Sequence, residues 1–84
     1  MSGGQRFVYI IRSRSNRSRY YTGVTSDVDR RLAAHNAGRC THTAPATPWE
    51  IVVVIEFAEE GRAIEFEKYL KSGSGVAFAT RHLR

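Results

Sequence analysis

The sequence is poor in cysteine, in long apolar runs and, over its first half, in acidic residues. A single cysteine, Cys40, excludes an internal disulfide, so the fold must hold without covalent cross-links. The longest uninterrupted apolar run is Ile51 to Ile55, far below the roughly 20 residues of a membrane-spanning helix. Residues 1–6 contain no apolar stretch of signal-peptide length. We therefore expect a soluble, cytoplasmic protein that has no membrane partner.

The length and composition favour one small folded domain. The chain has 84 residues, of which 42% are hydrophobic and 25% are charged, which suits a globular chain and argues against disorder. There are no internal repeats and no linker-like segment, so we expect a single domain over residues 1–84. A chain this short has a thin core, which leaves room for either a monomer or a weak homodimer.

The scarcity of acidic residues makes the first half strongly basic. Residues 1–49 contain eight arginines and two aspartates, for a net charge of +6, whereas residues 50–84 have a net charge of −1. Four of the arginines fall within one short acid-free segment: Arg12, Arg14, Arg17 and Arg19. Arginine forks fit phosphate groups in bidentate fashion. The segment either grips a phosphate backbone or is a solvated loop between two strands, and charge alone leaves both open.

Hydropathy patterning predicts the element order β-β-α-β-α, with a last short helix. The predicted strands are residues 6–12, 20–25 and 49–57, and the predicted helices are 27–36, 61–71 and 76–83. We expect Ser26 to cap the first helix and Gly38 to end it. The run Ile51 to Ile55 is apolar on both faces, which is typical of a central strand. The fold class is α+β, with a small three-stranded mixed or antiparallel sheet and flanking helices.

Both long helices place polar side chains beside their apolar faces. On helix 61–71, Glu67 falls inside the apolar arc at about 100° per residue. A carboxylate turned toward the sheet is costly unless it is paired or metal-bound, so Glu67 is a functional residue, a structural ion pair or a rim position. On helix 27–36, Arg31 and His35 lie one turn apart beside the apolar stripe. They could line a site, or be a snorkelling arginine and an ordinary partly buried histidine.

Two short motifs occur in the predicted strands, Phe7-Val8-Tyr9 and Tyr21-Thr22-Gly23. Arg31 follows ten residues after Tyr21, and Glu67 lies on a later helix. In this ordered set the sequence resembles the GIY-YIG nuclease domain, in particular its small stand-alone bacterial members, over roughly residues 6–75. It departs from the family pattern in having Phe7 for the first Gly and Thr22 for the second Ile. Residues 68–84 also lack the Asn that many members carry after the glutamate helix.

The resemblance implies a metal-dependent endonuclease that hydrolyses DNA phosphodiester bonds, with low sequence specificity or with a preference for DNA structure. It implies that Tyr9 and Tyr21 are the motif tyrosines and Arg31 the catalytic arginine. It implies that Glu67 is the ligand of one divalent metal ion, usually Mg²⁺. His35 matches a position that some family nucleases use in the site.

Other functions stay open beside this one. The Arg-rich hairpin, together with Gly23, which admits close approach of another group, would also suit a non-catalytic nucleic-acid-binding module. A tyrosine in a strand is most often a packing residue. A zinc site built on Cys40 and nearby histidines is disfavoured, because Cys-x-His is not a structural zinc spacing.

Overall fold

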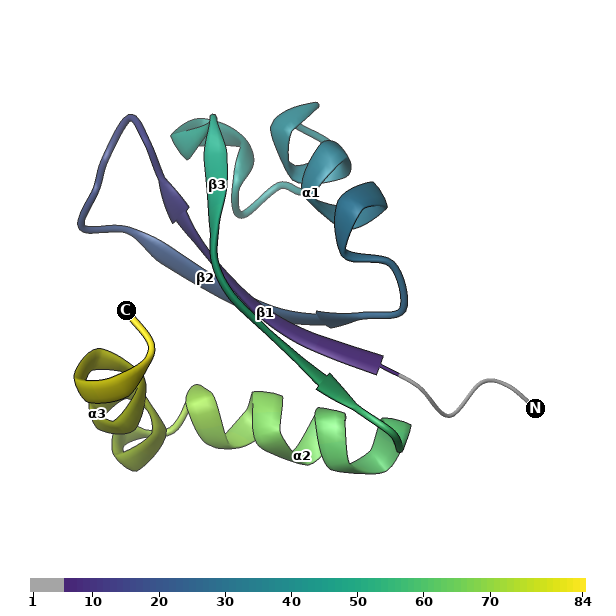
Figure 1. Cartoon of the computed structure of the whole chain (residues 1–84). Helices are drawn as coiled ribbons and strands as arrows, with labels where there is room; N and C mark the ends of the chain where they lie inside the picture. The colour runs from purple at the N-terminus through teal and green to yellow at the C-terminus, as the bar shows by residue number, and fades with distance from the viewer. Residues whose placement is uncertain (1–5) are drawn as a thin grey trace.

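The computed structural model describes residues 6–84, which form one sheet and helices on both of its faces (Figure 1). The elements are β1 (Arg6–Ser13), β2 (Tyr20–Thr25), α1 (Val28–Asn36), a turn of 3-10 helix η2 (Ala44–Ala46), β3 (Trp49–Phe57), α2 (Glu60–Leu70) and α3 (Gly73–His82). The predicted order is confirmed. Residues 1–5, which we included in the domain and searched for a signal-peptide stretch, lie outside the described residues.

The three strands form an antiparallel sheet in the order β2-β1-β3. The predicted α+β class is confirmed, and of the two sheet types the antiparallel one is found. The prediction that the third strand is central was wrong, because β1 takes that place. The apolar run of β3 reflects side chains on both faces of the sheet, and hydropathy does not record which strand has a free edge. Ile51 and Val54 of β3 remain 37% and 40% exposed.

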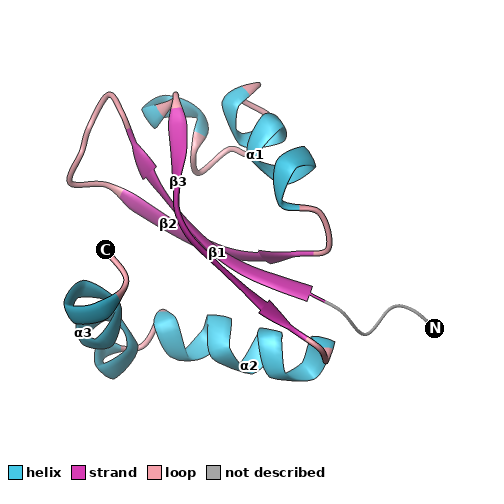
Figure 2. Cartoon of the chain, in the orientation of Figure 1, coloured by secondary structure: helices cyan, strands magenta, loops and turns pink. Residues whose placement is uncertain are grey.

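Two separate cores form because side chains of the central strand alternate between the two faces of the sheet (Figure 2). On one face, Val8 and Ile10 pack with buried residues of α2 and α3. On the other face, Tyr9 and Ile11 pack with Trp49 and Ala46, and Leu32 of α1 lies against them. The motif tyrosine Tyr9 is therefore itself a core residue, on the face of the sheet that α1 covers.

The ends of α1 follow known capping chemistry, with one correction. The N-cap is Asp27, not Ser26, and its carboxylate accepts a hydrogen bond from the Arg30 backbone N–H at 3.1 Å. Asp27 reaches the free N–H groups of the first turn at the position where the chain enters the helix, whereas Ser26 lies one residue too early. The predicted stop is confirmed, since Gly38 has φ +75 just beyond the C-cap Ala37.

The last helix begins earlier than predicted. α3 starts at Gly73, where Ser72 caps it by accepting from the Gly75 backbone N–H at 3.2 Å. The sequence predicted a loop at its glycine-rich first turn. Gly75 is needed there, because a Cβ at this position would collide with the backbone of Tyr69 and Leu70. The close approach lets α3 fold back directly after α2, which ends at Leu70 rather than at the predicted residue 71.

Asn36 joins the end of α1 to the start of β3. Its side-chain oxygen accepts from the Trp49 backbone N–H at 2.6 Å, and its side-chain N–H donates to the Trp49 carbonyl at 3.1 Å. The Trp49 indole N–H in turn donates to the Thr43 carbonyl at 2.8 Å. These bonds hold the loop 37–48 against the sheet and fix where α1 lies.

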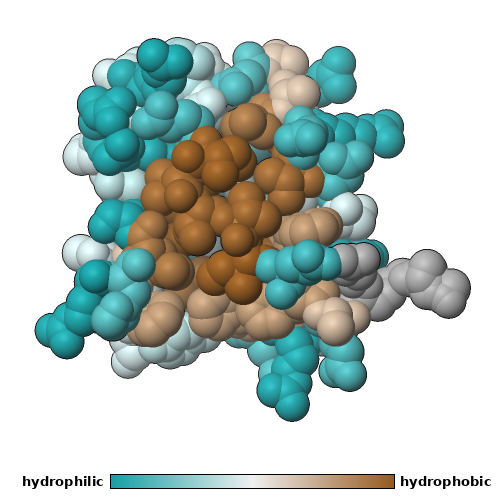
Figure 3. Space-filling view, viewed as in Figure 1, coloured by the Kyte–Doolittle hydropathy of each residue, from teal (hydrophilic) through white to brown (hydrophobic). Residues whose placement is uncertain are grey.

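One face of the molecule carries an apolar patch over the exposed edge strand β3 (Figure 3). Exposed apolar side chains also occur on α2 and α3, for example Tyr69 and Phe78. The longest helix has 11 residues, and none within residues 6–84 is long and apolar enough to cross a membrane.

Candidate active site

The site is built around Tyr9, which lies on the central strand directly opposite Gly23 of β2. A Cβ at position 23 would lie 2.6 Å from the Tyr9 ring carbon Cζ and closer still to the hydroxyl oxygen. The Tyr9 ring therefore occupies the space that any other side chain at position 23 would need. The close approach expected at Gly23 is confirmed, and the group that approaches is the protein's own tyrosine.

A buried chain of hydrogen bonds runs from Tyr9 through His35 to Thr43. The Tyr9 hydroxyl lies 2.8 Å from His35 Nε2, and His35 Nδ1 lies 2.8 Å from Thr43 Oγ1. Thr43 donates its own proton toward the Cys40 carbonyl at 3.4 Å, so its oxygen accepts from the Nδ1–H. This assigns the tautomer and leaves Nε2 to accept the Tyr9 proton.

Burial tunes the acidity of this pair. Tyr9 and His35 are 1% and 0% exposed. Burial lowers the pKa of His35, and the positive charge of Arg31 lowers it further, so the imidazole is neutral at pH 7. Burial also raises the pKa of Tyr9, although its hydrogen bond with Arg31 acts in the opposite direction. Tyr9 therefore keeps its proton, and its O–H donates a hydrogen bond to His35 Nε2.

Arg31 and Tyr21 bring this buried pair to the surface. Arg31 is exposed, and its hydrogen bond with the Tyr9 hydroxyl raises the pKa of Arg31. The Tyr21 ring centroid lies 5.0 Å from that of His35 and 6.4 Å from that of Tyr9. Four of the five predicted catalytic residues are thus in one cluster, with Tyr9 and His35 beneath and with Tyr21 and Arg31 facing outward.

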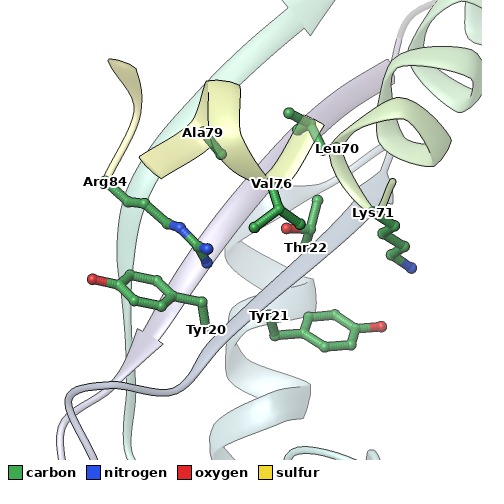
Figure 4. Close-up of a pocket in the computed structure, with 8 residues that line it drawn as sticks. All are labelled: Tyr20, Tyr21, Thr22, Leu70, Lys71, Val76, Ala79 and Arg84. Carbon is green, nitrogen blue, oxygen red and sulfur yellow. The ribbon is translucent and has the colours of Figure 1, made fainter. Parts of the chain in front are cut away.

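Glu67, the fifth, connects to the cluster through Lys71. Its carboxylate is 15% exposed and forms an ion pair with Lys71 one helical turn later. The Lys71 ammonium lies 5.8 Å from the centroid of the Tyr21 ring, and Figure 4 shows the two side chains next to each other. The inward position predicted for Glu67 agrees with its low exposure, and its immediate partner is an ammonium group.

The oxygen chemistry of Glu67 fits a hydrated magnesium ion. Mg²⁺ keeps several waters and is usually bound by one or two carboxylates together with substrate phosphates. Within residues 6–84 no three His, Cys, Asp or Glu side chains are grouped to hold a metal. A metal ion here would therefore have Glu67 as its protein ligand, with water and phosphate oxygens as the others, and Lys71 would have to move aside.

A family model described as the GIY-YIG catalytic domain matches residues 5–76. The chain belongs to the GIY-YIG family. It is 35% identical over 68 residues to the UPF0213 protein lwe0147 of Listeria welshimeri, covering 80% of this chain and 73% of that protein. It is 34% identical over 92 residues to the structure-specific endonuclease subunit SLX1 of Podospora anserina, covering 92% of this chain and 27% of that protein.

A solved structure shares the fold of this GIY-YIG domain. The solution NMR structure of the UPF0213 protein BH0048 from Bacillus halodurans matches with a TM-score of 0.55 and 28% sequence identity. The match covers 92% of this chain and 83% of that chain. Small single-domain bacterial proteins are thus among the relatives of this GIY-YIG domain, and its family is one of nucleases.

The arginines of the hairpin lie apart from the hydrogen bonds around Tyr9. Glu50 of β3 pairs with three of them, at 3.4 Å from Arg12, 3.9 Å from Arg14 and 3.6 Å from Arg17. Arg19 donates to the His42 carbonyl at 2.8 Å. Part of the positive charge that the sequence places in this hairpin is therefore offset within the fold. The role of these arginines in binding nucleic acid stays a prediction.

Two residues of this GIY-YIG site were missed in the sequence. Thr43 orients His35, but no local pattern marks a threonine in an irregular loop as the partner of a histidine on the preceding helix. Lys71 could have been found, because it stands four residues after Glu67, at the C-cap of the same helix, where oppositely charged side chains meet. His35, one of the histidines of the disfavoured zinc alternative, has both ring nitrogens in these hydrogen bonds.

Proposed function

We propose that this GIY-YIG domain hydrolyses phosphodiester bonds in DNA with the help of a divalent metal ion, Mg²⁺. The proposal includes low sequence specificity or a preference for DNA structure, as the name of the SLX1 relative suggests. The observation that carries it is the cluster of Tyr21 and Arg31 over the buried Tyr9–His35 pair, to which Glu67 is linked through Lys71. We further propose that the chain acts as one domain over residues 1–84, as a monomer or weak homodimer, in the cytoplasm.

Arg31 is the phosphate clamp of the proposed reaction. Its exposed guanidinium presents a fork of N–H donors to the non-bridging oxygens, on which charge grows in the transition state. The neighbouring Tyr9 hydroxyl raises the pKa of Arg31, so the guanidinium stays charged beside it before substrate arrives. Preorganised donors of this kind act without a reorganisation cost at the moment of reaction.

The tyrosines and His35 have different tasks. Tyr9 is almost fully buried and keeps its proton, so it positions Arg31 and does not meet the substrate. Tyr21 is partly exposed, and its ring packs against His35. Its hydroxyl is the group that can orient the attacking water by accepting a hydrogen bond from it, and it can relay the proton of that water if it releases its own proton to solvent. Glu67 would hold the Mg²⁺ ion, which when bound supplies positive charge at the phosphate and at the leaving oxygen.

The test of the proposal is metal-dependent cleavage. We expect the wild-type protein to nick supercoiled plasmid with Mg²⁺ and not with EDTA. Glu67→Gln should abolish nicking, while Glu65→Gln, which changes an exposed carboxylate two residues away on the same helix, should keep it. Nicking by Glu67→Gln at the wild-type rate would remove Glu67 from the mechanism.

Arg31 offers a second prediction. Arg31→Ala should lower kcat by about 10²-fold or more, the loss typical when one transition-state donor is removed. Arg62→Ala, which changes an exposed arginine on α2 that lines neither cavity along β2, should change kcat far less. Single-turnover cleavage of a labelled oligonucleotide measures both, and equal losses would argue against a specific clamp.

The same assays separate the alternative function. A non-catalytic nucleic-acid-binding module that uses the arginines of the hairpin would retain DNA with or without Mg²⁺ and never cut it. Retention of branched, single-stranded and duplex DNA, measured beside cleavage of the same three substrates, decides between the two.

A further inference from the structure

Two cavities lie along β2, one at each end of this edge strand. The first, of about 280 Å³, is lined by Tyr20, Tyr21 and Thr22 at the start of β2 (Figure 4). The second, of about 330 Å³, is lined by Thr25 at the end of β2 and by Ser26. Gly23, against which the Tyr9 ring lies, stands between them. The proposed active site therefore has a hollow on either side along one edge of the sheet.

The first cavity combines cations with aromatic rings. Lys71 and Arg84 line it together with Tyr20 and Tyr21, and no acidic residue does. The Arg84 guanidinium lies 4.2 Å from the centroid of the Tyr20 ring, a cation–π contact that holds it in place. Figure 4 shows Lys71 beside Tyr21 at one end and Arg84 beside Tyr20 at the other.

The second cavity is also basic. Three arginines of α1 and the loop after it line the cavity: Arg30, Arg31 and Arg39. The acidic residue in its lining, Asp27, already accepts the Arg30 backbone N–H as the cap of α1. Arg31 belongs both to this cavity and to the proposed phosphate clamp, just as Tyr21 belongs to the first cavity and to the tyrosine cluster. Each cavity is thus continuous with the site.

The two cavities and the edge of β2 between them form a continuous line of cations and aromatic rings, which we call the track. Its chemistry suits a single strand better than a duplex. Concave surfaces that combine cations with stacking aromatics bind single-stranded nucleic acid, whereas a duplex is read by a convex element that enters a groove. The six residues of β2 span about 17 Å at about 3.4 Å per residue. That length matches roughly five stacked nucleotides at about 3.4 Å each.

We propose that a single-stranded segment of DNA lies along the outer edge of β2, with flanking phosphates bound by Lys71 and Arg84 in one cavity and by Arg30 and Arg39 in the other. This inference rests on the proposed function, because it places the scissile phosphate at Arg31. It names the substrate form as a single strand, such as a flap or an unpaired end, and it assigns binding to Lys71 and Arg84, which the family motifs do not include.

A pair of matched double variants tests the first cavity. Lys71→Gln with Arg84→Gln removes two charges from the cavity, just beyond the ends of α2 and α3. Lys68→Gln with Arg81→Gln removes two charges from exposed positions within these helices that do not line it. Fluorescence anisotropy with a labelled dT12 oligonucleotide in EDTA gives the affinity. We expect at least a tenfold loss in the cavity double variant and a loss within about twofold in the control.

The salt dependence gives a second measurement from the same titrations. Each phosphate contact on a single strand contributes about 0.7 to the slope of log K against log salt concentration. The cavity double variant should therefore have a slope smaller by about 1.4, while the control keeps the wild-type slope. Equal affinity losses and equal slopes in the two double variants would overturn the proposal, as would an absence of dT12 binding by the wild type at low salt.

A second pair leaves Lys71 and its ion pair with Glu67 in place. Val76→Glu adds a carboxylate to the cavity lining, whereas Ala77→Glu adds one to the adjacent exposed position outside it. We expect Val76→Glu to weaken dT12 binding at least fivefold more than Ala77→Glu, and to weaken a duplex of the same length no more than the control does. Equal effects of the two variants on dT12 would count against the cavity.

The outcomes separate this inference from the proposed nuclease activity. Binding is measured without metal, so a wild-type protein that binds dT12 through the cavity but cuts nothing with Mg²⁺ would contradict the nuclease and leave the track standing. Mg²⁺-dependent cleavage that is lost in Glu67→Gln, together with indifference of dT12 binding to the cavity variants, would contradict the track alone.

Discussion

At the scale of single residues, the most demanding position has no side chain. Gly23 lies under the Tyr9 ring, whose hydroxyl is hydrogen-bonded to His35 and raises the pKa of Arg31. A methyl group there must displace either the ring or β2, and the ring is fixed by the core that surrounds it. The proposed site therefore depends on a glycine that provides none of its chemistry.

Gly23→Ala should lower the free energy of unfolding by about 1–3 kcal/mol, the usual cost of overpacking. It should also reduce cleavage strongly, because Tyr9 moves away from Arg31. Gly61→Ala is the matched control, since a Cβ there meets nothing within 4 Å, and alanine is the better helix former. Urea unfolding and the nicking assay measure both variants. A fully active, stable Gly23→Ala protein would contradict the packing that we describe.

His35 makes the stability depend on pH. Its pKa is lowered in the folded protein, so the unfolded chain binds a proton that the folded chain excludes. The contribution of neutral His35 is therefore complete above its unfolded pKa of about 6.5 and is lost as the pH falls below it toward the folded value. The urea midpoint should be lower at pH 5.5 than at pH 7.5.

Two histidine variants test the origin of this loss. His35→Gln should flatten the change between pH 7.5 and pH 5.5, whereas His42→Gln, at an exposed position, should keep it. Cleavage per folded molecule should fall only at a lower pH than the stability does, as the pH approaches the lowered pKa of folded His35, because a protonated His35 cannot accept a hydrogen bond from Tyr9. A drop in stability that persists in His35→Gln would assign the effect to other groups.

The sequence could predict which side chains share a face, and it predicted most of the cluster. Helical spacing placed Arg31 and His35 on one face of α1, whereas Tyr9 and Tyr21 were implied by the resemblance to the GIY-YIG domain. Which groups they meet depends on tertiary contacts. The approach of Thr43 to His35 results from the path of the loop after α1, and no periodicity encodes that path.

At the scale of elements, the connection between α1 and β3 is unusual in depending on one amide side chain. Asn36 makes two hydrogen bonds to the backbone of Trp49, in the way that a neighbouring strand would. The helix that carries Arg31 and His35 is therefore fixed at its C-terminal end by Asn36, while Asp27 caps its N-terminal end.

Asn36→Ala should destabilise the fold by about 1–3 kcal/mol, because it leaves two backbone groups of Trp49 without their partner. Asn36→Asp should cost more, since it keeps the acceptor but places a negative oxygen against the Trp49 carbonyl. Asn16→Ala, in the exposed hairpin, is the control with a small expected effect. Thermal unfolding followed by circular dichroism measures all three, and an unaltered midpoint in Asn36→Ala would show that this connection is dispensable.

The elements themselves were predictable where hydropathy and caps agree. The bounds of β2 and β3 match the prediction, and those of α1 and α2 differ by one residue. The prediction failed for the position of β3 in the sheet and for the start of α3. In both cases the deciding contact is tertiary: the pairing of β1 with both neighbours, and the packing of Gly75 on the backbone of α2.

At the scale of the whole molecule, the two cores share the central strand. Val8 and Ile10 belong to one core and Tyr9 and Ile11 to the other, so neither core can open without disturbing β1. The molecule should therefore unfold as one cooperative unit, although its helices lie on opposite faces of the sheet.

Ile10→Val tests this cooperativity. It should lower the free energy of unfolding by about 0.5–1.5 kcal/mol. Native-state hydrogen exchange should show the same loss at amides of α2, near the substitution, and at the Trp49 indole N–H in the opposite core. A loss confined to α2 would show that the two cores unfold independently.

Thr43 contacts two aromatic residues at once: its hydroxyl accepts from His35 and its carbonyl accepts from the indole of Trp49. Trp49 is the sole tryptophan of the chain and is 3% exposed. Its fluorescence is therefore an intrinsic, label-free signal from the immediate surroundings of His35. Acidification that displaces His35 should shift the emission maximum, so the proposed site can be followed optically in the unmodified protein.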